Sequence, residues 1–378
     1  MREGVVDVRA LRLSNVEAEE PDGDSLAVDY FNGGKRMKKP HAIFLIIFAI
    51  VLSAHAQGNP PLRLIHTTPL PGIQGDLEHF AYDLKGNRLF LGTEDHKTVE
   101  VFNLRTGERL HSITGFKAPP HALLYLPKAN ELLVTAGDGV GMVDVFSGDD
   151  YKLVKTIDLL PGVDCALYDP ATKYYYVQSG IDDPSWKTHY LHIIDTETLK
   201  HIGDIILPGS HSEAMAIDHA TDLLYVNLTR VDEVGVVDLK KRQLVATWPL
   251  TDAHAREPVP MAIDAPNHRL FIATRHPAKL IVFDTDTGKI IATFPCVSEN
   301  DDMTFDRGRK RIYISGNGAV GVYEERDPDH YVHIADVPSA YRTKTHVFVP
   351  ELNRLYVGAC GKFKPGTLLK LLIFQIEP

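Results

Sequence analysis

The sequence predicts an all-β fold built from seven repeated units of four strands, and three observations support this prediction. One pattern recurs seven times after residue 60: a short apolar segment, a polar turn and a second apolar segment, as in MAIDHATDLLYVN. The second segments lie 42 to 49 residues apart, aligned on Leu89, Leu132, Tyr175, Leu224, Leu270, Ile312 and Leu355. No segment shows the 3.6-residue period of a helix. A period of roughly 40–50 residues with several strands per unit is typical of a β-propeller.

Four strands are expected in each repeat, and the fifth repeat shows them most clearly. Its apolar segments cover residues 260–264, 269–274, 279–285 and 289–295, and they alternate apolar and polar positions as strands do. Gly288 stands in the turn between the third and fourth segments, and Gly107 has the same place in the first repeat. A tight hairpin there needs positive φ, which glycine adopts readily.

The seventh repeat lacks a fourth strand, because the chain ends at Pro378 soon after its third apolar segment. Residues 62–69, by contrast, resemble a fourth strand without the three that should precede it. We therefore expect residues 62–69 to complete the last blade. This closure leaves no open sheet edge between the first and last blades of a seven-bladed ring.

Composition and charge exclude some function classes. The 378 residues carry a net charge of −10, with 44% hydrophobic and 24% charged residues. No basic stripe is present to bind phosphates, which argues against nucleic acid and against an anionic membrane surface. The repeats account for nearly all of the chain after residue 60, so residues 57–378 are expected to form one propeller, and we expect a monomer.

The N-terminal region has the three parts of a secretory signal peptide over residues 37–56. Basic residues at 35–39 precede an apolar run at 42–54, and Ala54-His55-Ala56 forms a small-x-small cleavage site. The run is shorter than the roughly 20 residues that span a membrane. We therefore expect cleavage and a periplasmic or secreted protein. Residues 1–36 are expected to be a non-native extension, with translation starting at Met37.

The three cysteines, Cys165, Cys296 and Cys360, lie in different repeats and show no CxxC spacing. We expect free, partly buried thiols without a catalytic role. The absence of CxxCH also excludes covalently attached c-type haem.

The repeat register locates a candidate site at the mouth of the central channel. The residue eleven positions before each aligned residue marks the entry to the first strand of its repeat. Six of these seven entry residues are ionisable, and the exception is Val259. Neighbouring positions, among them Asp302 and His346, and the loops between second and third strands add further polar and charged residues on the same face. The predicted site comprises Glu78, His79, His121, Asp164, His211, Glu213, Asp301, Lys344, Arg230 and Arg275.

Three interpretations of these residues stay open at this stage. Carboxylates and imidazole from consecutive blades (Glu78, His121, Asp164 and Glu213) suit a divalent cation such as Ca²⁺, Mn²⁺ or Zn²⁺. A polar channel mouth is equally consistent with a solvated rim in which Lys344 pairs with Glu78 or Asp301. Arg230, Arg275, His276 and Lys344 together would suit a small anion or carboxylate.

The repeats resemble the YVTN-type repeats of YncE-like exported propellers. The shared pattern is xxxxDPxxxRLYVxxx followed by VxVxDxxTGxxxxxI, and ALYDPATKYYYV and RLFIATRHPAKLIVFDTDTGKIIATFP are two examples of it in this chain. The resemblance covers residues 62–378. The YVTN tetrapeptide itself is absent, and its nearest match is Tyr225-Val-Asn-Leu228. The resemblance implies an exported ligand-binding or protein-interaction module. It also implies an alternative, a metal-dependent lactonase-type hydrolase, but gluconolactonases carry Glu-Gly-Pro where this chain has Leu77-Glu78-His79-Phe80. The Gly-His and Trp-Asp pairs of WD40 repeats are missing.

Overall fold

The computed structural model describes residues 60–180, 183, 185–361, 364 and 366–378. These residues form 28 strands in seven antiparallel sheets, and their only helices are the short 3-10 turns η1 (Thr251–Ala253), η2 (Ala265–Asn267) and η3 (Pro350–Leu352). The predicted signal peptide and the predicted extension lie outside the described residues. Within the described part of the chain, no helix has the length and apolar character that crossing a membrane requires.

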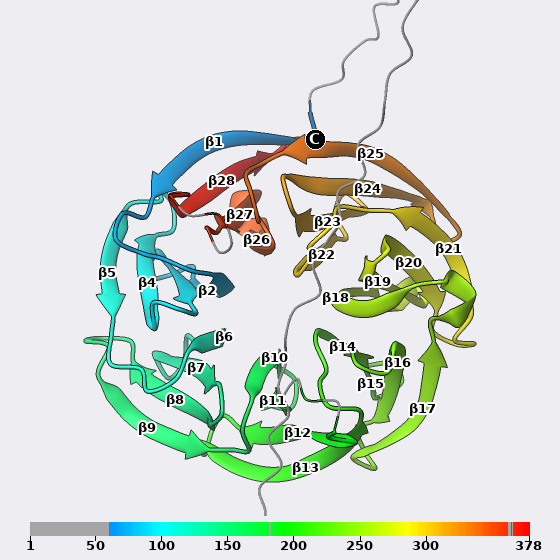
Figure 1. The fold of residues 1–378 in the computed structure, drawn as a ribbon, viewed down its shortest axis with the longest axis horizontal. Coiled ribbons are helices and arrows are strands. Elements are labelled where there is room, and N and C mark those ends of the chain that lie inside the picture. Colours follow the sequence, from blue (N-terminus) through cyan, green and yellow to red (C-terminus); the bar gives the residue numbers. More distant parts are fainter. Residues whose placement is uncertain (1–59, 181–182, 184, 362–363, 365) are drawn as a thin grey trace, which may run out of the picture. The chain divides into compact units, whose positions relative to one another are not determined.

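The seven sheets stand around a centre as the blades of a ring (Figure 1), which confirms the predicted fold class. Strands are given from the centre outward. The first blade consists of β2 (Leu77–Asp83), β3 (Arg88–Thr93), β4 (Thr98–Asn103) and β5 (Arg109–Ile113), and the second of β6 (Pro120–Leu126), β7 (Glu131–Gly137), β8 (Gly141–Ser147) and β9 (Leu153–Asp158). The third blade consists of β10 (Val163–Asp169), β11 (Tyr174–Ser179), β12 (Thr188–Asp195) and β13 (Lys200–Pro208), and the fourth of β14 (Met215–Asp218), β15 (Leu223–Leu228), β16 (Glu233–Asp238) and β17 (Gln243–Pro249). The fifth blade consists of β18 (Arg256–Asp264), β19 (Arg269–His276), β20 (Ala278–Asp284) and β21 (Ile290–Pro295), and the sixth of β22 (Met303–Asp306), β23 (Arg311–Gly316), β24 (Ala319–Asp327) and β25 (His330–Pro338). The seventh blade consists of β26 (Thr345–Val349), β27 (Arg354–Ala359), β28 (Lys370–Ile376) and β1 (Leu62–Pro69).

The ring closes as the sequence predicts, with β1 as the outer strand of the seventh blade. The strand pairs antiparallel with β28, so that Leu62 lies opposite Ile376 and Pro69 lies opposite Lys370. Leu62 is buried in the same apolar cluster as Phe374. The two ends of the described chain therefore share one sheet, and this pairing joins the first blade to the last.

The core lies between neighbouring blades. Leu270 and Phe283 of the fifth blade pack in one cluster with Tyr225 and Val236 of the fourth, and Leu270 is fully buried. Because each blade is covered on both faces by its neighbours, the second and third strands are apolar at consecutive positions. This packing explains the near-continuous apolar runs in the sequence.

The predicted glycine turns are present between third and fourth strands. Gly107 and Gly288 have φ of 76° and 68°, and each amide donates to a carbonyl four residues earlier, at Asn103 and Asp284, over 2.8 Å. A side chain at Gly288 would also collide with the Trp248 indole, since a Cβ would lie 2.5 Å from its nitrogen. Glycine is thus required here both for backbone conformation and for packing.

Candidate functional site at the centre of the ring

Hydrogen bonds from the preceding blade position the strand entries that carry the candidate site. Thr135 Oγ1 donates to the Asp164 carbonyl over 3.0 Å, and Ser315 Oγ donates to the Lys344 carbonyl over 2.6 Å. Asn227 Nδ2 makes the equivalent bond to the Val259 carbonyl over 3.0 Å. Each donor lies on the second strand of its blade and is fully buried. The backbone of these entries is therefore fixed from outside, and the side chains are free to face the centre.

Bulges in the inner strands explain why adjacent residues reach the same place. The pairing of β2 with β3 shifts register between Leu77 and Phe80, and the pairing of β10 with β11 shifts between Val163 and Ala166. A bulge interrupts the alternation of side chains between the two faces of a strand. As a result, Glu78 and His79 both contribute to the central cluster, and so do Asp164 and Cys165.

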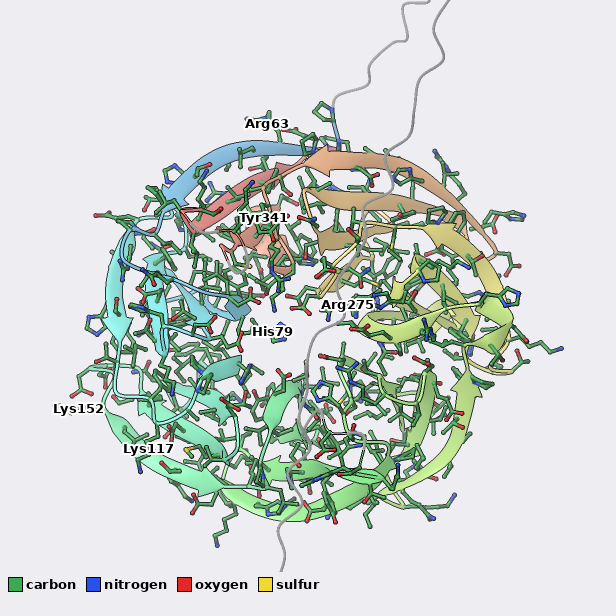
Figure 2. All side chains as sticks on the ribbon, in the orientation of Figure 1. Arg63, His79, Lys117, Lys152, Arg275 and Tyr341 are labelled. Carbon is green, nitrogen blue, oxygen red and sulfur yellow. The ribbon has the colours of Figure 1, made fainter. Side chains whose placement is uncertain are left out.

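The structure joins nine of the ten predicted residues in one network, to which all seven blades contribute. Contacts of 2.7 to 3.9 Å link its members through Cys165 and Asp302 in addition to the predicted residues. Figure 2 shows His79 and Arg275 close to the ring centre, whereas Arg63 and Lys152 lie at its outside. The predicted members are Glu78, His79, His121, Asp164, His211, Glu213, Asp301, Lys344 and Arg275.

Arg230 lies at the edge of this network, close enough for its charge to act on the pKa of the His211 imidazole. It lines a surface pocket of about 330 Å³ together with Arg256, Glu257 and His276. Arg275, which the sequence groups with it, contacts Asp301 with 2.7 Å between Nη2 and Oδ1, and it also contacts Glu257 of that pocket with 3.4 Å between Nη1 and Oε1. Arg275 therefore connects the surface pocket to the central network.

One side of the network, which we call the lysine half, consists of Lys344, Glu78, Asp301, Asp76 and Arg275. Lys344 Nζ lies 3.2 Å from Glu78 Oε1, 3.0 Å from Asp301 Oδ2 and 3.8 Å from Asp76 Oδ2. Glu78, Asp301 and Lys344 are 5%, 9% and 8% exposed, so this half is a buried ion network and not a solvated rim.

The electrostatics of the lysine half keep its central pair charged. Burial by itself lowers the pKa of Lys344, but Asp301, Glu78 and Asp76 raise it well above its usual value. Burial likewise raises the pKa of Glu78, and Lys344 and His121 reverse this effect and hold it well below its usual range. An ammonium ion attached to the chain therefore occupies the space among three carboxylates.

The other side, which we call the thiol half, consists of Cys165, His79, Asp164, Glu213 and His211. Cys165 Sγ donates to Glu213 Oε2 over 3.1 Å and lies 3.6 Å from His79 Nε2. The other oxygen of Glu213 lies 3.0 Å from His211 Nε2. Asp164 is the most exposed member, at 26% of its side chain, so this half is open to solvent on one side.

Cys165, His79 and Asp302 form a line of contacts that resembles a cysteine–histidine–aspartate triad. His79 Nδ1 lies 3.2 Å from an Asp302 carboxylate oxygen. The protonation states, however, are those of an inactive nucleophile. Burial, together with Glu213 and Asp164, raises the pKa of the Cys165 thiol well above its usual value. Burial lowers the pKa of His79, but Asp302 overrides it and raises the value to about 10, so this imidazole cannot accept the thiol proton at neutral pH.

His121 connects the two halves. Its Nδ1 lies 3.6 Å from Asp164 Oδ1 and 3.9 Å from Glu78 Oε2. Burial lowers its pKa, but Asp164 and Glu78 raise it to about 9. Glu78, His121 and Asp164 offer ligand atoms within 4.8 Å of one another. Glu213 belongs to a different such group, with Asp164 and His211, so the four residues considered as one metal site divide into two sets that share Asp164.

Sequence reasoning gave Cys165 no role in the site, and it placed Asp302 among the neighbouring residues of the channel mouth but not in the predicted site. All three cysteines are free, as expected, but Cys165 lies inside the candidate site. The available signal was the repeat register: His79, Cys165, Asp302 and Thr345 each stand one position after a predicted entry residue. Strict alternation along a strand argues against using that second position. For His79 and Cys165 the inner-strand bulges make it accessible, whereas Asp302 directly precedes β22.

Comparisons with known proteins support the fold. No protein-family model matches the sequence, and no curated protein matches it. Solved structures do match: a chain from the mitotic checkpoint complex has a TM-score of 0.68 at 14% identity, covering 94% of this chain and 99% of its own. A chain from Kuenenia stuttgartiensis hydrazine synthase has a TM-score of 0.64 at 14% identity, covering 81% and 98%. At these identities the similarity shows the propeller architecture alone.

Proposed function

We propose that this protein is an exported, YncE-like β-propeller that binds a ligand or a protein partner through the charged network at the centre of its ring. The propeller fold is suited to binding, because rigid strands hold residues from several blades around one place. The YVTN-like repeats and the signal-peptide pattern support the assignment to an exported family.

The observation that carries the proposal is the convergence of charged side chains from all seven blades on one mostly buried network. Removing charges from water is costly, and an apolar centre of the same size would be at least as stable. The fold nevertheless gathers Glu78, Asp164, Glu213 and Lys344 there and fixes several strand entries with buried hydrogen bonds. Perturbed ionisable groups gathered in this way are typical of functional sites.

Native mass spectrometry of the full chain, purified without chelators, tests this proposal. We expect a bound mass, or a rise in melting temperature with a divalent cation or a small organic ligand. Asp164→Asn should abolish either effect, because Asp164 is the most exposed member of the thiol half. Asp195→Asn, which changes a turn-side carboxylate at the end of β12, is the control and should behave as wild type. A wild-type protein without bound mass or shift would contradict the proposal.

A second candidate function is that of a metal-dependent hydrolase of the lactonase type. The observation that favours it is the group of ligand atoms from Glu78, His121 and Asp164 within 4.8 Å. A cation held there would polarise a carbonyl or activate water. Hydrolysis of aliphatic lactones with added Ca²⁺, Mn²⁺ or Zn²⁺, lost in His121→Gln, would support an enzyme. Absence of turnover with all three ions would leave the binding function alone.

A further inference from the structure

We propose that the thiol half is a zinc-class metal site, with Cys165 Sγ, His79 Nε2 and an Asp164 carboxylate oxygen as ligands and Glu213 Oε2 as the fourth. This inference rests on the proposed function, because it names the ligand class of the same central network. The three ligand atoms of Cys165, His79 and Asp164 all lie within 4.8 Å of one another.

Two distances in the thiol half are close to those of tetrahedral coordination. Zinc bonds of about 2.0 Å to nitrogen or oxygen and about 2.3 Å to sulfur place neighbouring ligand atoms roughly 3.5 Å apart. Cys165 Sγ lies 3.6 Å from His79 Nε2 and 3.1 Å from Glu213 Oε2. The Asp164 carboxylate lies within 4.8 Å of Cys165 and His79, so it must move towards the ion when the ion binds.

The surroundings of His79 also fit a metal ligand. Imidazole ligands commonly donate their second N–H to a carboxylate, which fixes the nitrogen that faces the metal. His79 Nδ1 contacts Asp302 in this way, at 3.2 Å. Asp302 is itself held by Thr345 Oγ1 at 2.7 Å and by the His346 amide at 2.8 Å. The orientation that directs His79 Nε2 towards Cys165 is thus already built.

The ligand types favour zinc over calcium. Calcium requires six to eight oxygen ligands, whereas sulfur and imidazole select zinc and similar transition-metal ions. The oxygen-rich part of the network is the lysine half, where the Lys344 ammonium already stands among Glu78, Asp301 and Asp76. Partial exposure of Asp164 and His79, at 26% and 20% of their side chains, leaves the thiol half accessible to an ion from solvent.

A second cluster could also bind zinc, so the experiment needs a protein in which that cluster is disrupted. His192, His201 and Asp204 on β12 and β13 offer ligand atoms within 4.8 Å. Both imidazoles contact Asp204 Oδ1, at 2.5 Å and 2.6 Å. The parent protein for the test is therefore the full chain carrying His201→Asn.

Co²⁺ is the probe, because a thiolate ligand gives it a charge-transfer band and a tetrahedral site gives it intense visible bands. We expect one equivalent to bind the parent protein with both signatures and to be displaced by Zn²⁺. Adding Cys165→Ser should abolish the charge-transfer band and weaken Zn²⁺ binding by at least about 100-fold. Cys296→Ser is the matched control, since this thiol lies outside the network, and it should leave both unchanged.

Two further variants keep the result interpretable. His79→Gln should remove the tetrahedral spectrum while Cys165 is retained, and metal-free melting temperatures show whether each variant is folded. Co²⁺ spectra that are the same in Cys165→Ser and the parent, or no Co²⁺ binding by a folded parent, would overturn the zinc site. If another ligand still stabilises that parent and depends on Asp164, the proposed function survives this failure; if none does, both fall.

Discussion

The lysine half and the thiol half each contain strand-entry residues from the same register position, yet they differ in how their carboxylates are neutralised. In the lysine half, Glu78 and Asp301 contact an ammonium that belongs to the chain, at 3.2 and 3.0 Å. In the thiol half, Glu213 contacts a thiol and an imidazole, at 3.1 and 3.0 Å. Residue type around one register position thus decides whether a carboxylate at the ring centre contacts a cation of the chain itself or a thiol and an imidazole.

The largest expected effect comes from deleting residues 61–70, because the lysine half depends on the blade that β1 completes. Lys344 directly precedes β26 of that blade. The deletion removes the partner of β28 and the buried Leu62 and Leu70, which together should contribute roughly 3–6 kcal/mol. We expect a clear fall in melting temperature, measured by calorimetry. An unchanged melting temperature would rule out this closure.

Lys344→Met tests whether the Lys344 ammonium neutralises the buried carboxylates of the lysine half. The substitution leaves Glu78, Asp301 and Asp76 buried without their shared ammonium, and we expect a loss of about 3–5 kcal/mol in unfolding free energy. Urea denaturation at pH 7 measures the change. Lys241→Met removes a surface ion pair with Asp238 in which the lysine is 67% exposed, and it should alter stability by less than about 1 kcal/mol. Equal effects would contradict the comparison.

His346, whose amide supports Asp302, predicts a pH dependence. Burial lowers the pKa of its imidazole to about 4, against the favourable effect of Asp302. The unfolded chain binds this proton near pH 6.5, so stability is fully present above that pH and is lost as pH falls towards 4. The loss is roughly 3 kcal/mol.

The measurement is urea denaturation of wild type and His346→Gln between pH 4.5 and 7.5. The difference between the two proteins isolates this group from His79, His121 and His211, whose raised pKa values act in the opposite direction. Parallel pH profiles would show that His346 does not titrate in this way.

Much of the fold could be predicted because repetition is visible in one dimension. The seven units, the four strands in each and the closure by residues 62–69 follow from spacing and from the missing strand, and pairing of β1 with β28 confirms the closure. The place of the candidate site also follows from the register. Its composition was incomplete: Cys165 stands one position away, where the bulge in β10 lets its side chain reach the centre, and Asp302 stands among the neighbouring residues outside the predicted set.

The sequence by itself determined the number of blades, how the ring closes and which residues stand at the entries to the inner strands. The tertiary structure decided which of the possible ion pairs form: Lys344 contacts both Glu78 and Asp301, which the sequence offered as alternatives. Lys344 and Glu78 are 266 positions apart, and no local pattern specifies the 3.2 Å between them. The physical reason is that strand patterns report burial and period, which are local, whereas neutralisation depends on distances across the ring. Those distances divide the central network into a half that holds its own cation and a half whose thiol, imidazoles and carboxylates face one another.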